Sequence, residues 1–196
     1  MKIILATHNR DKEKELQISL KGMNIEVISL FDFPEIGDIE ETGTTLLENS
    51  LLKSRLVFRK TGIPTIADDT GLEVDFLNGA PGVYSARYAG NNVSYKDNVN
   101  KLLIELNGIP SEKRTARFRT VITFVDENQE LSTEGHIDGV ISESIKGDGG
   151  FGYDPIFFVP HLGKTFAELS SIEKNKISHR GIALQKLRKI LINVLI

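Results

Sequence analysis

The pattern of apolar and polar positions along the chain predicts alternating strands and helices. Short apolar runs bounded by turn residues are typical of buried strands. Such runs cover residues 2–7, 25–30, 65–67 and 156–159. Apolar residues spaced three and four apart are typical of helices instead. Such stretches cover residues 11–21, residues 45–60, the segment after Ser94 and the C-terminal segment from Ser178.

Each predicted helix has one apolar face that we expect to pack on a core. These faces carry Leu16 and Leu20; Leu47, Leu51 and Phe58; Val99, Leu102, Leu103 and Leu106; and Leu184, Leu187, Leu191, Val194 and Leu195. Glycines 22, 62 and 108 follow the first three helices, where a residue in the left-handed conformation commonly ends a helix. Ser94 is a suitable N-cap for the third.

From residue 115 to 125 the apolar period changes to two, which predicts a strand. One face of it carries Ala116, Phe118, Ile122 and Phe124. Residues 126–129 supply a turn into a partner strand that ends near Gly135. Helices alternating with strands early in the chain and a hairpin later predict an α/β protein with an elongated mixed β-sheet flanked by helices. We expect a single domain over residues 1–196, in two lobes with a cleft between them.

Composition restricts the kind of function. The 196 residues are 40% hydrophobic and carry a net charge of -3, which disfavours a general nucleic-acid or membrane-surface binder. Because the chain has no cysteine, disulfides, thiolate metal sites and cysteine nucleophiles are excluded. No apolar run approaches the ~20 residues of a membrane-spanning helix. The amino-terminal segment does not resemble a signal peptide, so we expect a cytoplasmic protein.

Two adjacent acids, Asp68 and Asp69, follow the apolar run at residues 65–67. Neighbouring residues of a strand point to opposite faces, so both side chains cannot serve one pocket from an extended backbone. One interpretation is that one of them faces a functional site. The alternative is that both form an Asx-type turn before Gly71.

The segment from Thr7 to Lys12 joins the first predicted strand to the first predicted helix. Such a junction presents backbone N–H groups and the positive end of the helix dipole, which suits a phosphate group, and Lys12 adds a full charge. The segment lacks the glycine and lysine spacing of a Walker loop. Most junctions of this kind bind nothing, so the alternative is a purely structural turn.

A pair of acids, Glu40 and Glu41, lies in the loop before the second helix. For the charges on that helix, including Lys53, the commoner interpretation is an ordinary solvated face. The loop acids suggest more, because Mg²⁺ prefers one or two carboxylates together with water and phosphate oxygens. Glu41 with Asp69 would form such an incomplete shell.

Two later segments have side chains suited to a nucleotide. The glycine-rich segment 147–158 contains Phe151, whose ring offers a stacking face, although a tight turn packed on the core is the alternative. A basic stretch at residues 173–181 gathers Lys174, His179 and Arg180, and its alternative is simple solvation. Taken together with the acids and the phosphate-suited junction, these features indicate a nucleoside triphosphate site.

Five segments resemble, in order and spacing, the inosine/xanthosine triphosphate pyrophosphatases. They are "LATHNRDK", "EETGTTLLENSLLKSR", "ADDTGLEVDFLNGAPGVYSARYAG", "GGFGYDPIF" and "KNKISHRGIAL", and together they span Ile3 to Leu184. The resemblance implies a homodimeric, Mg²⁺-dependent enzyme. Its substrates would be the deaminated purine nucleoside triphosphates ITP, dITP and XTP, and its products a nucleoside monophosphate and pyrophosphate.

The resemblance also implies roles for individual residues. The metal ligands fall on Glu41 and Asp69, and the general base falls on Asp69 as well. The phosphate-contacting residues would be Thr7, His8, Asn9, Arg10, Asp11, Lys12, Lys53 and Thr70. The base-contacting residues would be Phe151, Gly152, Tyr153, Asp154, Lys174, His179 and Arg180. Thr70 stands where the family usually has serine and keeps the hydroxyl, and His8 stands where the family often has glycine.

Alternative functions remain open from sequence alone. The chain could be a related pyrophosphatase for other aberrant nucleotides, such as modified pyrimidines. It could also be a nucleotide-sensing module without turnover, although a sensor would need cations and no second acid over the reacting phosphate. We expect a purine nucleoside triphosphate as the partner, with no nucleic acid and no membrane.

Overall fold

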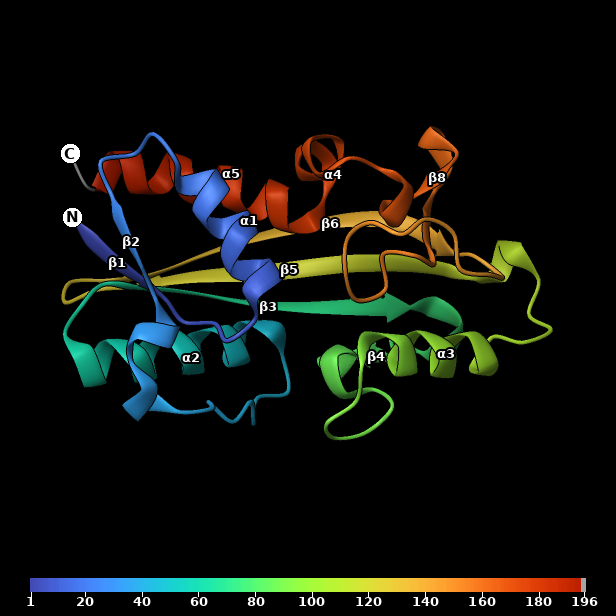
Figure 1. The fold of residues 1–196 in the computed structure, drawn as a ribbon, viewed down its shortest axis with the longest axis horizontal. Coiled ribbons are helices and arrows are strands. Elements are labelled where there is room, and N and C mark those ends of the chain that lie inside the picture. The colour runs from blue at the N-terminus through green and yellow to red at the C-terminus, as the bar shows by residue number, and fades with distance from the viewer. Residues whose placement is uncertain (195–196) are drawn as a thin grey trace. The chain divides into compact units, whose positions relative to one another are not determined.

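The computed structural model describes the backbone of residues 1–194 and the side chains of residues 1–192. Its strands are β1 (Lys2–Leu5), β2 (Glu26–Ser29), β3 (Thr65–Val74), β4 (Pro81–Gly82), β5 (Thr115–Val125), β6 (Glu130–Ile141), β7 (Phe157–Val159) and β8 (Lys164–Thr165). Its helices are α1 (Arg10–Leu20), α2 (Leu46–Thr61), α3 (Tyr95–Glu105), α4 (Ser171–Ile177) and α5 (His179–Val194) (Figure 1).

The strands form one mixed eight-stranded sheet in the order β2-β1-β3-β5-β6-β7-β8, with β4 paired to β3. β1 is parallel to both β2 and β3, whereas β4 pairs with β3, and β7 with β6 and β8, in antiparallel fashion. This arrangement confirms the predicted α/β class with a mixed sheet flanked by helices. Among the helices that the structure describes, none combines the length and the apolar character needed to cross a bilayer.

The chain divides into two compact units. Unit 1 comprises Met1–Asp69, Thr120–Gly135 and the chain from Arg180 on, and unit 2 comprises Thr70–Arg119 and His136–His179. The long strands β3, β5 and β6 therefore contribute residues to both units. Each unit has a hydrophobic core of its own.

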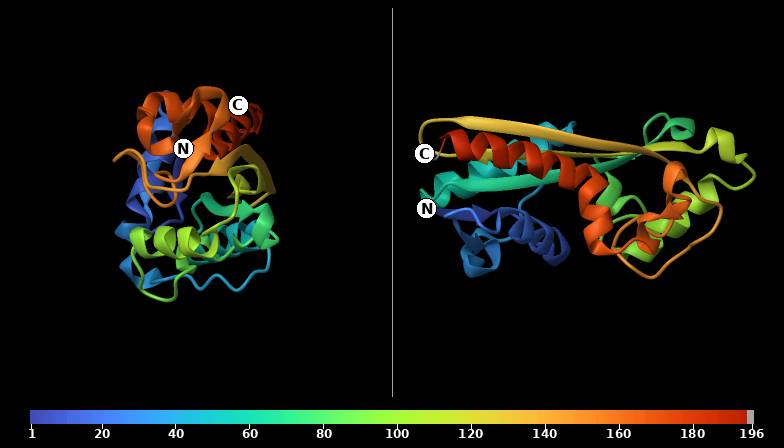
Figure 2. Two further views of the ribbon diagram at one scale, coloured as in Figure 1. Left: turned by 90° about the vertical axis from the view of Figure 1, so that its right-hand side faces the viewer. Right: turned by 90° about the horizontal axis from the view of Figure 1, so that it is seen from above.

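Helices cover both faces of the sheet in unit 1, with α1 and α5 on one side and α2 on the other (Figure 1). β1 shows why, because its apolar side chains alternate between two cores. Ile3 and Leu5 pack in the cluster that contains residues of α1 and α5, whereas Ile4, together with Ala6 just after the strand, packs in the cluster that contains Val57 of α2. α5 runs alongside the first part of β6 (Figure 2), where Thr133 donates a hydrogen bond to the carbonyl of Ala183 at 3.0 Å.

The predicted core face of α2 is wrong. Leu47 is 39% exposed, and Leu51 and Phe58 are only partly buried. The buried residues are Leu46, Asn49, Ser50, Lys53, Ser54 and Val57. Apolar periodicity could not find this face because most of it is polar.

Hydroxyl groups make the polar face of α2 compatible with burial. Ser50 and Ser54 each lie 2.9 Å from the hydroxyl of Thr123 in β5, and Ser50 also donates to the carbonyl of Ala67 in β3 at 3.1 Å. Buried polar groups are tolerated when they are paired in this way. The contacts fix α2 against two strands of the sheet.

Unit 2 packs α3 on the part of the sheet that surrounds Phe118 and Phe157. Ser94 caps α3 as predicted, with a reciprocal bond between its side chain and Asp97. Val99, Leu102 and Leu106 are buried as the helical spacing predicts.

Several predicted boundaries are wrong. β3 continues to Val74 and β6 to Ile141, beyond their predicted ends, because ladder pairing does not require the apolar side chains on which the predictions relied. The helix α4 was not predicted. Leu184, Leu187 and Leu191 of α5 are buried as expected, whereas the predicted burial of Val194 and Leu195 falls on side chains outside those described.

Candidate active site

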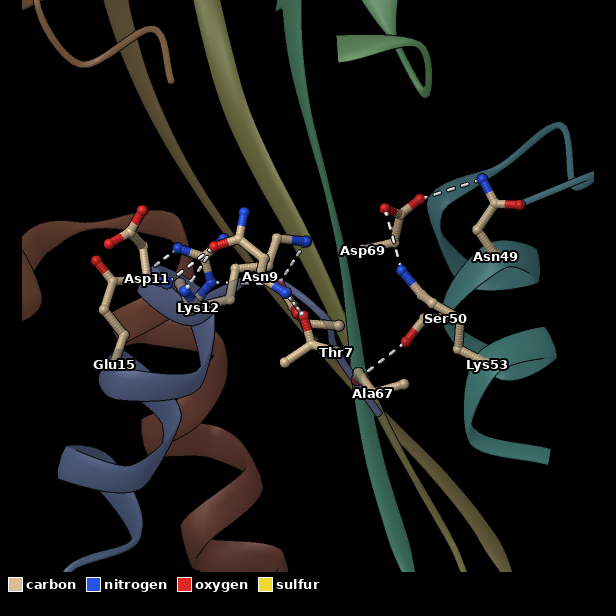
Figure 3. A network of polar contacts seen from close by, with 12 residues as sticks. Thr7, Asn9, Asp11, Lys12, Glu15, Asn49, Ser50, Lys53, Ala67 and Asp69 are labelled. Carbon is tan, nitrogen blue, oxygen red and sulfur yellow. Dashed lines mark hydrogen bonds and ion pairs between the residues drawn. The ribbon is translucent and has the colours of Figure 1, made fainter. Parts of the chain in front are cut away.

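Asp68 and Asp69 lie inside β3 and face opposite sides of it. Asp69 turns toward Asn49 and Lys53 of α2, whereas Lys12 of α1 lies on the other side of the strand (Figure 3). Lys12 pairs with Asp68 at 3.2 Å. The alternative of an Asx-type turn is therefore wrong, since both acids belong to a continuous strand.

Asp69, Glu41 and Lys53 form what we call the acid–lysine cluster. The ammonium of Lys53 lies 2.5 Å from Glu41 Oε1 and 3.6 Å from Asp69 Oδ1, so one cation joins both acids. Asp69 and Lys53 are buried, at 4% and 8% exposure. The structure thus brings together the two residues predicted as metal ligands and the lysine predicted to contact phosphate.

The electrostatics of the acid–lysine cluster differ between its members. Burial by itself lowers the pKa of the Lys53 ammonium, but the carboxylates of Asp69 and Glu41 outweigh it and raise that pKa, so Lys53 stays charged. Burial raises the pKa of Asp69, and the nearby Glu41 adds to this although Lys53 opposes it. A carboxylate with a raised pKa is a stronger base than an ordinary aspartate.

The acid–lysine cluster fits a hard divalent cation. Its two carboxylates already share one positive charge, that of Lys53, and oxygen donors of this kind suit Mg²⁺. Within residues 1–192 no group of three or more histidine, cysteine or acidic side chains converges on one point. A cation held here would therefore complete its shell with water or phosphate oxygens.

On the other side of β3, Lys12, Glu15, Asp68 and Arg180 form what we call the buried charge network. Asp68 Oδ2 accepts from Arg180 Nε at 3.2 Å and pairs with Lys12 at the same distance. Arg180 Nη1 donates to Glu15 Oε2 at 2.5 Å. The guanidinium of Arg180, predicted to contact the base, thus has two acids of unit 1 as partners and is 2% exposed.

Opposite charges dominate the buried charge network. Burial alone would raise the pKa of Asp68, but Lys12 and Arg180 lower it far below its usual range. Burial lowers the pKa of Arg180, and Asp68 and Glu15 raise it by more. Asp68 is therefore an ionised carboxylate whose charge is balanced within the protein fold.

The predicted phosphate segment forms the start of α1. Asn9 is its N-cap, and Asn9 Oδ1 accepts from the backbone N–H groups of Asp11 and Lys12 at 2.9 and 3.1 Å. Thr7 Oγ1 accepts from the N–H of Asn9 at 3.2 Å. The cap of α1 thus uses two of the N–H groups that the sequence suggested for a phosphate.

Two basic side chains of this segment contact Phe31. The guanidinium of Arg10 lies 3.5 Å from the centre of its ring, and the ring of His8 meets it edge-on at 5.4 Å. Arg10 also donates to Glu13 at 3.0 Å. These contacts hold both side chains at the surface of unit 1.

Unit 2 holds Phe151, Asp154 and Lys174 together, in what we call the aromatic–lysine cluster. Lys174 Nζ donates to Asp154 Oδ2 at 2.6 Å and lies 4.8 Å from the centre of the Phe151 ring. The same Asp154 oxygen accepts from the Phe151 N–H at 2.8 Å. A Cβ on Gly150 would lie 2.0 Å from that oxygen, so glycine is required where the loop closes on Asp154.

The other predicted base-contacting residues of unit 2 are held by the core. His179 stacks on Phe118, with ring centres 4.5 Å apart and planes at 15°. Tyr153 is 4% exposed and donates to the carbonyl of Ser85 at 2.9 Å, and burial raises its pKa. Gly152, by contrast, is partly exposed, as is Thr70, which is predicted to contact phosphate.

Sequence reasoning missed Asn49 and Glu15. Asn49 is completely buried and donates to Asp69 Oδ2 at 3.2 Å. One signal existed, because Asn49 lies one helical turn before Lys53 and so shares its face. Glu15 gave no signal, since its partner Arg180 is far away in the sequence.

Comparison with known proteins extends over nearly the whole chain. Residues 3–190 match the model of the Ham1 family. A protein of Thermoanaerobacter sp. (strain X514) named dITP/XTP pyrophosphatase is 53% identical over 188 residues, covering 96% of this chain and 95% of its own. A protein of the same name from Listeria monocytogenes (strain EGD-e) is 50% identical, covering 98% and 96%.

Solved structures agree with these sequence matches. A HAM1 protein from Coxiella burnetii superposes with a TM-score of 0.91 at 41% identity, covering 98% of this chain and 99% of its own. The Staphylococcus aureus Ham1 protein gives 0.89 at 40% identity with the same coverage. The resemblance that the motifs indicated is thereby confirmed.

Proposed function

This chain belongs to the Ham1 family, and we propose that it hydrolyses the deaminated purine nucleoside triphosphates ITP, dITP and XTP to the nucleoside monophosphate and pyrophosphate. The names of its relatives support this substrate class. The observation that carries the chemistry is the acid–lysine cluster, where the carboxylates of Asp69 and Glu41 share the ammonium of Lys53.

Asp69 is the proposed general base. Release of pyrophosphate requires water to attack the α-phosphorus while the leaving group is stabilised, which is mainly a matter of positioning and electrostatics. The raised pKa of Asp69 favours uptake of the proton from that water. Lys53, which stays charged, would balance negative charge on the polyphosphate.

Glu41 and Asp69 would hold Mg²⁺. When bound, this ion would neutralise phosphate charge and lower the pKa of a coordinated water. Asp69 has two carboxylate oxygens, of which Oδ1 faces Lys53 and Oδ2 accepts from Asn49. Oδ1 is therefore the oxygen proposed to hold the ion, and Oδ2, which accepts from Asn49, has a second lone pair that could take the proton.

The aromatic–lysine cluster is proposed to bind the purine. Phe151 offers a ring face for stacking, and stacked bases are stabilised by about 1–3 kcal/mol each. Hypoxanthine and xanthine carry a carbonyl at ring position 6 where adenine carries an amino group. A buried protein donor that adenine would leave unpaired can discriminate against adenine by about 10⁴-fold, and Lys174 and His179 are the candidate donors in unit 2.

Other parts of the proposal come from the family resemblance. They are a homodimer, Mg²⁺ as the metal, and contacts of Arg180 with the base, whereas a cytoplasmic location and one domain with two lobes remain predictions from the sequence. In the structure Arg180 is engaged by Asp68 and Glu15, so its use by a ligand would require exchange of these partners.

An Mg²⁺-dependent ITP assay with product identification tests the proposal. We expect pyrophosphate rather than orthophosphate, and faster turnover of ITP than of ATP or modified pyrimidine triphosphates. Asp69→Asn should keep nucleotide binding and lose most hydrolysis. Faster turnover of dUTP or methylated pyrimidines would favour a different substrate class, and unchanged hydrolysis by Asp69→Asn would contradict the assigned base.

A further inference from the structure

Asn49 connects the two acids of the acid–lysine cluster. Its side chain is completely buried. Nδ2 donates to Asp69 Oδ2 at 3.2 Å, and Oδ1 accepts from the backbone N–H of Gly43 at 2.8 Å. Gly43 lies two residues after Glu41, so one amide contacts both the strand that carries one acid and the loop that carries the other.

The contact between Asn49 and the loop depends on glycine at position 43. A Cβ at this position would lie 2.7 Å from Asn49 Oδ1 and 2.7 Å from Glu48 Cβ. Contacts this short do not occur between a Cβ and its neighbours, so a larger residue would push the loop away from α2. The backbone near Glu41 is therefore packed directly against the amide of Asn49.

Asn49 and Lys53 contact different oxygens of Asp69. They lie one helical turn apart on the same face of α2. Asn49 binds Oδ2, whereas Lys53 lies 3.6 Å from Oδ1 and also binds Glu41. A neutral amide thus fixes one oxygen, and the other is directed toward the side where Glu41 lies.

We propose that Asn49 is a positioning residue that fixes Asp69 through Oδ2 and the Glu41 loop through Gly43, so that both carboxylates address one divalent cation. This inference rests on the proposed function, because it assigns a preorganising group to the proposed metal site. Groups that orient metal ligands by hydrogen bonds commonly change metal affinity or activity by about 10–100-fold when removed.

The chain contains a matched control for this role. Asn98 follows the N-cap and capping box of α3 just as Asn49 follows those of α2. It is 2% exposed, accepts from the N–H of Ala89 at 2.7 Å, and donates to the carbonyl of Ala86 at 3.0 Å. Both asparagines make hydrogen bonds to the backbone of the loop before their helix, but of the two only Asn49 donates to a carboxylate.

The experiment compares Asn49→Ala with Asn98→Ala in the full chain without nucleotide. Binding of Mn²⁺, which favours oxygen ligands as Mg²⁺ does, is titrated by the electron paramagnetic resonance signal of the free ion, and thermal unfolding is recorded in parallel. We expect Asn49→Ala to bind Mn²⁺ about 10–100-fold more weakly. Asn98→Ala should lose comparable stability and bind Mn²⁺ like the wild type.

A second variant and a kinetic measurement separate positioning from folding. Gly43→Ala retains the Asn49 side chain and displaces the loop from it, so it should also weaken Mn²⁺ binding, and it tests the contact between Asn49 and the loop if Asn49→Ala does not fold. With ITP at saturating Mg²⁺, Asn49→Ala should lower kcat more than it changes KM.

Three outcomes would overturn the inference. Equal Mn²⁺ affinity in wild type and Asn49→Ala would overturn only the positioning role of Asn49 and would leave the proposed function intact. Equal weakening by Asn98→Ala would assign the effect to general destabilisation. Absence of Mn²⁺ binding by the wild-type chain would overturn the proposed metal site, and this inference with it.

Discussion

Adjacent aspartates of β3 are expected to respond in opposite ways to the same substitution. Asp68 has no exposed side-chain surface and balances two cations, Lys12 and Arg180, each at 3.2 Å. Asp68→Asn removes the charge but keeps an oxygen in place. Removing one partner of a buried ion pair costs about 3–5 kcal/mol. Because the asparagine retains a hydrogen-bond acceptor, we expect Asp68→Asn to lose about 3 kcal/mol of the free energy of unfolding, at the low end of this range.

Thermal unfolding followed by circular dichroism measures this cost. For a chain of this length, each kcal/mol shifts Tm by about 2–4 °C. Asp68→Asn should therefore lower Tm by about 6–12 °C. Asp69→Asn is the matched control, and it should lower Tm less, because burial disfavours the charged form of Asp69 and Lys53 keeps Glu41 as a partner at 2.5 Å.

The activities should show the reverse order. Asp69→Asn should lose most ITP hydrolysis, whereas folded Asp68→Asn should retain the proposed base and metal ligands. The reasoning is refuted if Asp68→Asn unfolds within about 1 kcal/mol of the wild type. It is refuted equally if both variants lose the same stability, since the two faces of β3 would then be equivalent.

Three further predictions concern pH, the core of unit 2 and the base. Because the folded pKa of Asp68 is lowered, its carboxylate contributes its full stabilisation at any pH above the unfolded pKa. In urea titrations, the stability difference between wild type and Asp68→Asn should therefore stay constant from pH 7 to about pH 5 and shrink below about pH 4. Arg114→Met should cost about 3 kcal/mol in urea unfolding, because the guanidinium donates to three carbonyls and each lost hydrogen bond costs at least about 1 kcal/mol. As the control, Arg117→Met breaks an exposed pair with Asp138 and should cost under about 1 kcal/mol. Equal losses in the two variants would contradict this account. Phe151→Ala should raise KM for ITP about 10-fold with little change in kcat, as expected for about 1–3 kcal/mol of stacking, and an unchanged KM would exclude Phe151 as the base platform.

The N-cap Ser94 and the amphipathic spacing of α3 depend on neighbouring residues, and the sequence alone located them. The same holds for β5, whose bounds agree with its period of two. The motifs identified the family because their order and spacing can be read directly from the sequence. The alternation of side chains in a strand also predicted that Asp68 and Asp69 face different sides.

The tertiary structure decided which side each acid faces and what it meets there. Asp68 pairs with Arg180, which lies 112 residues away in the sequence, so no local sequence pattern could predict the pair. The buried face of α2 is polar because the Thr123 hydroxyl of β5 and a carbonyl of β3 are available to pair with it. Apolar periodicity is set by local geometry, whereas the burial of a charge or an amide is stable only where distant segments supply its partners.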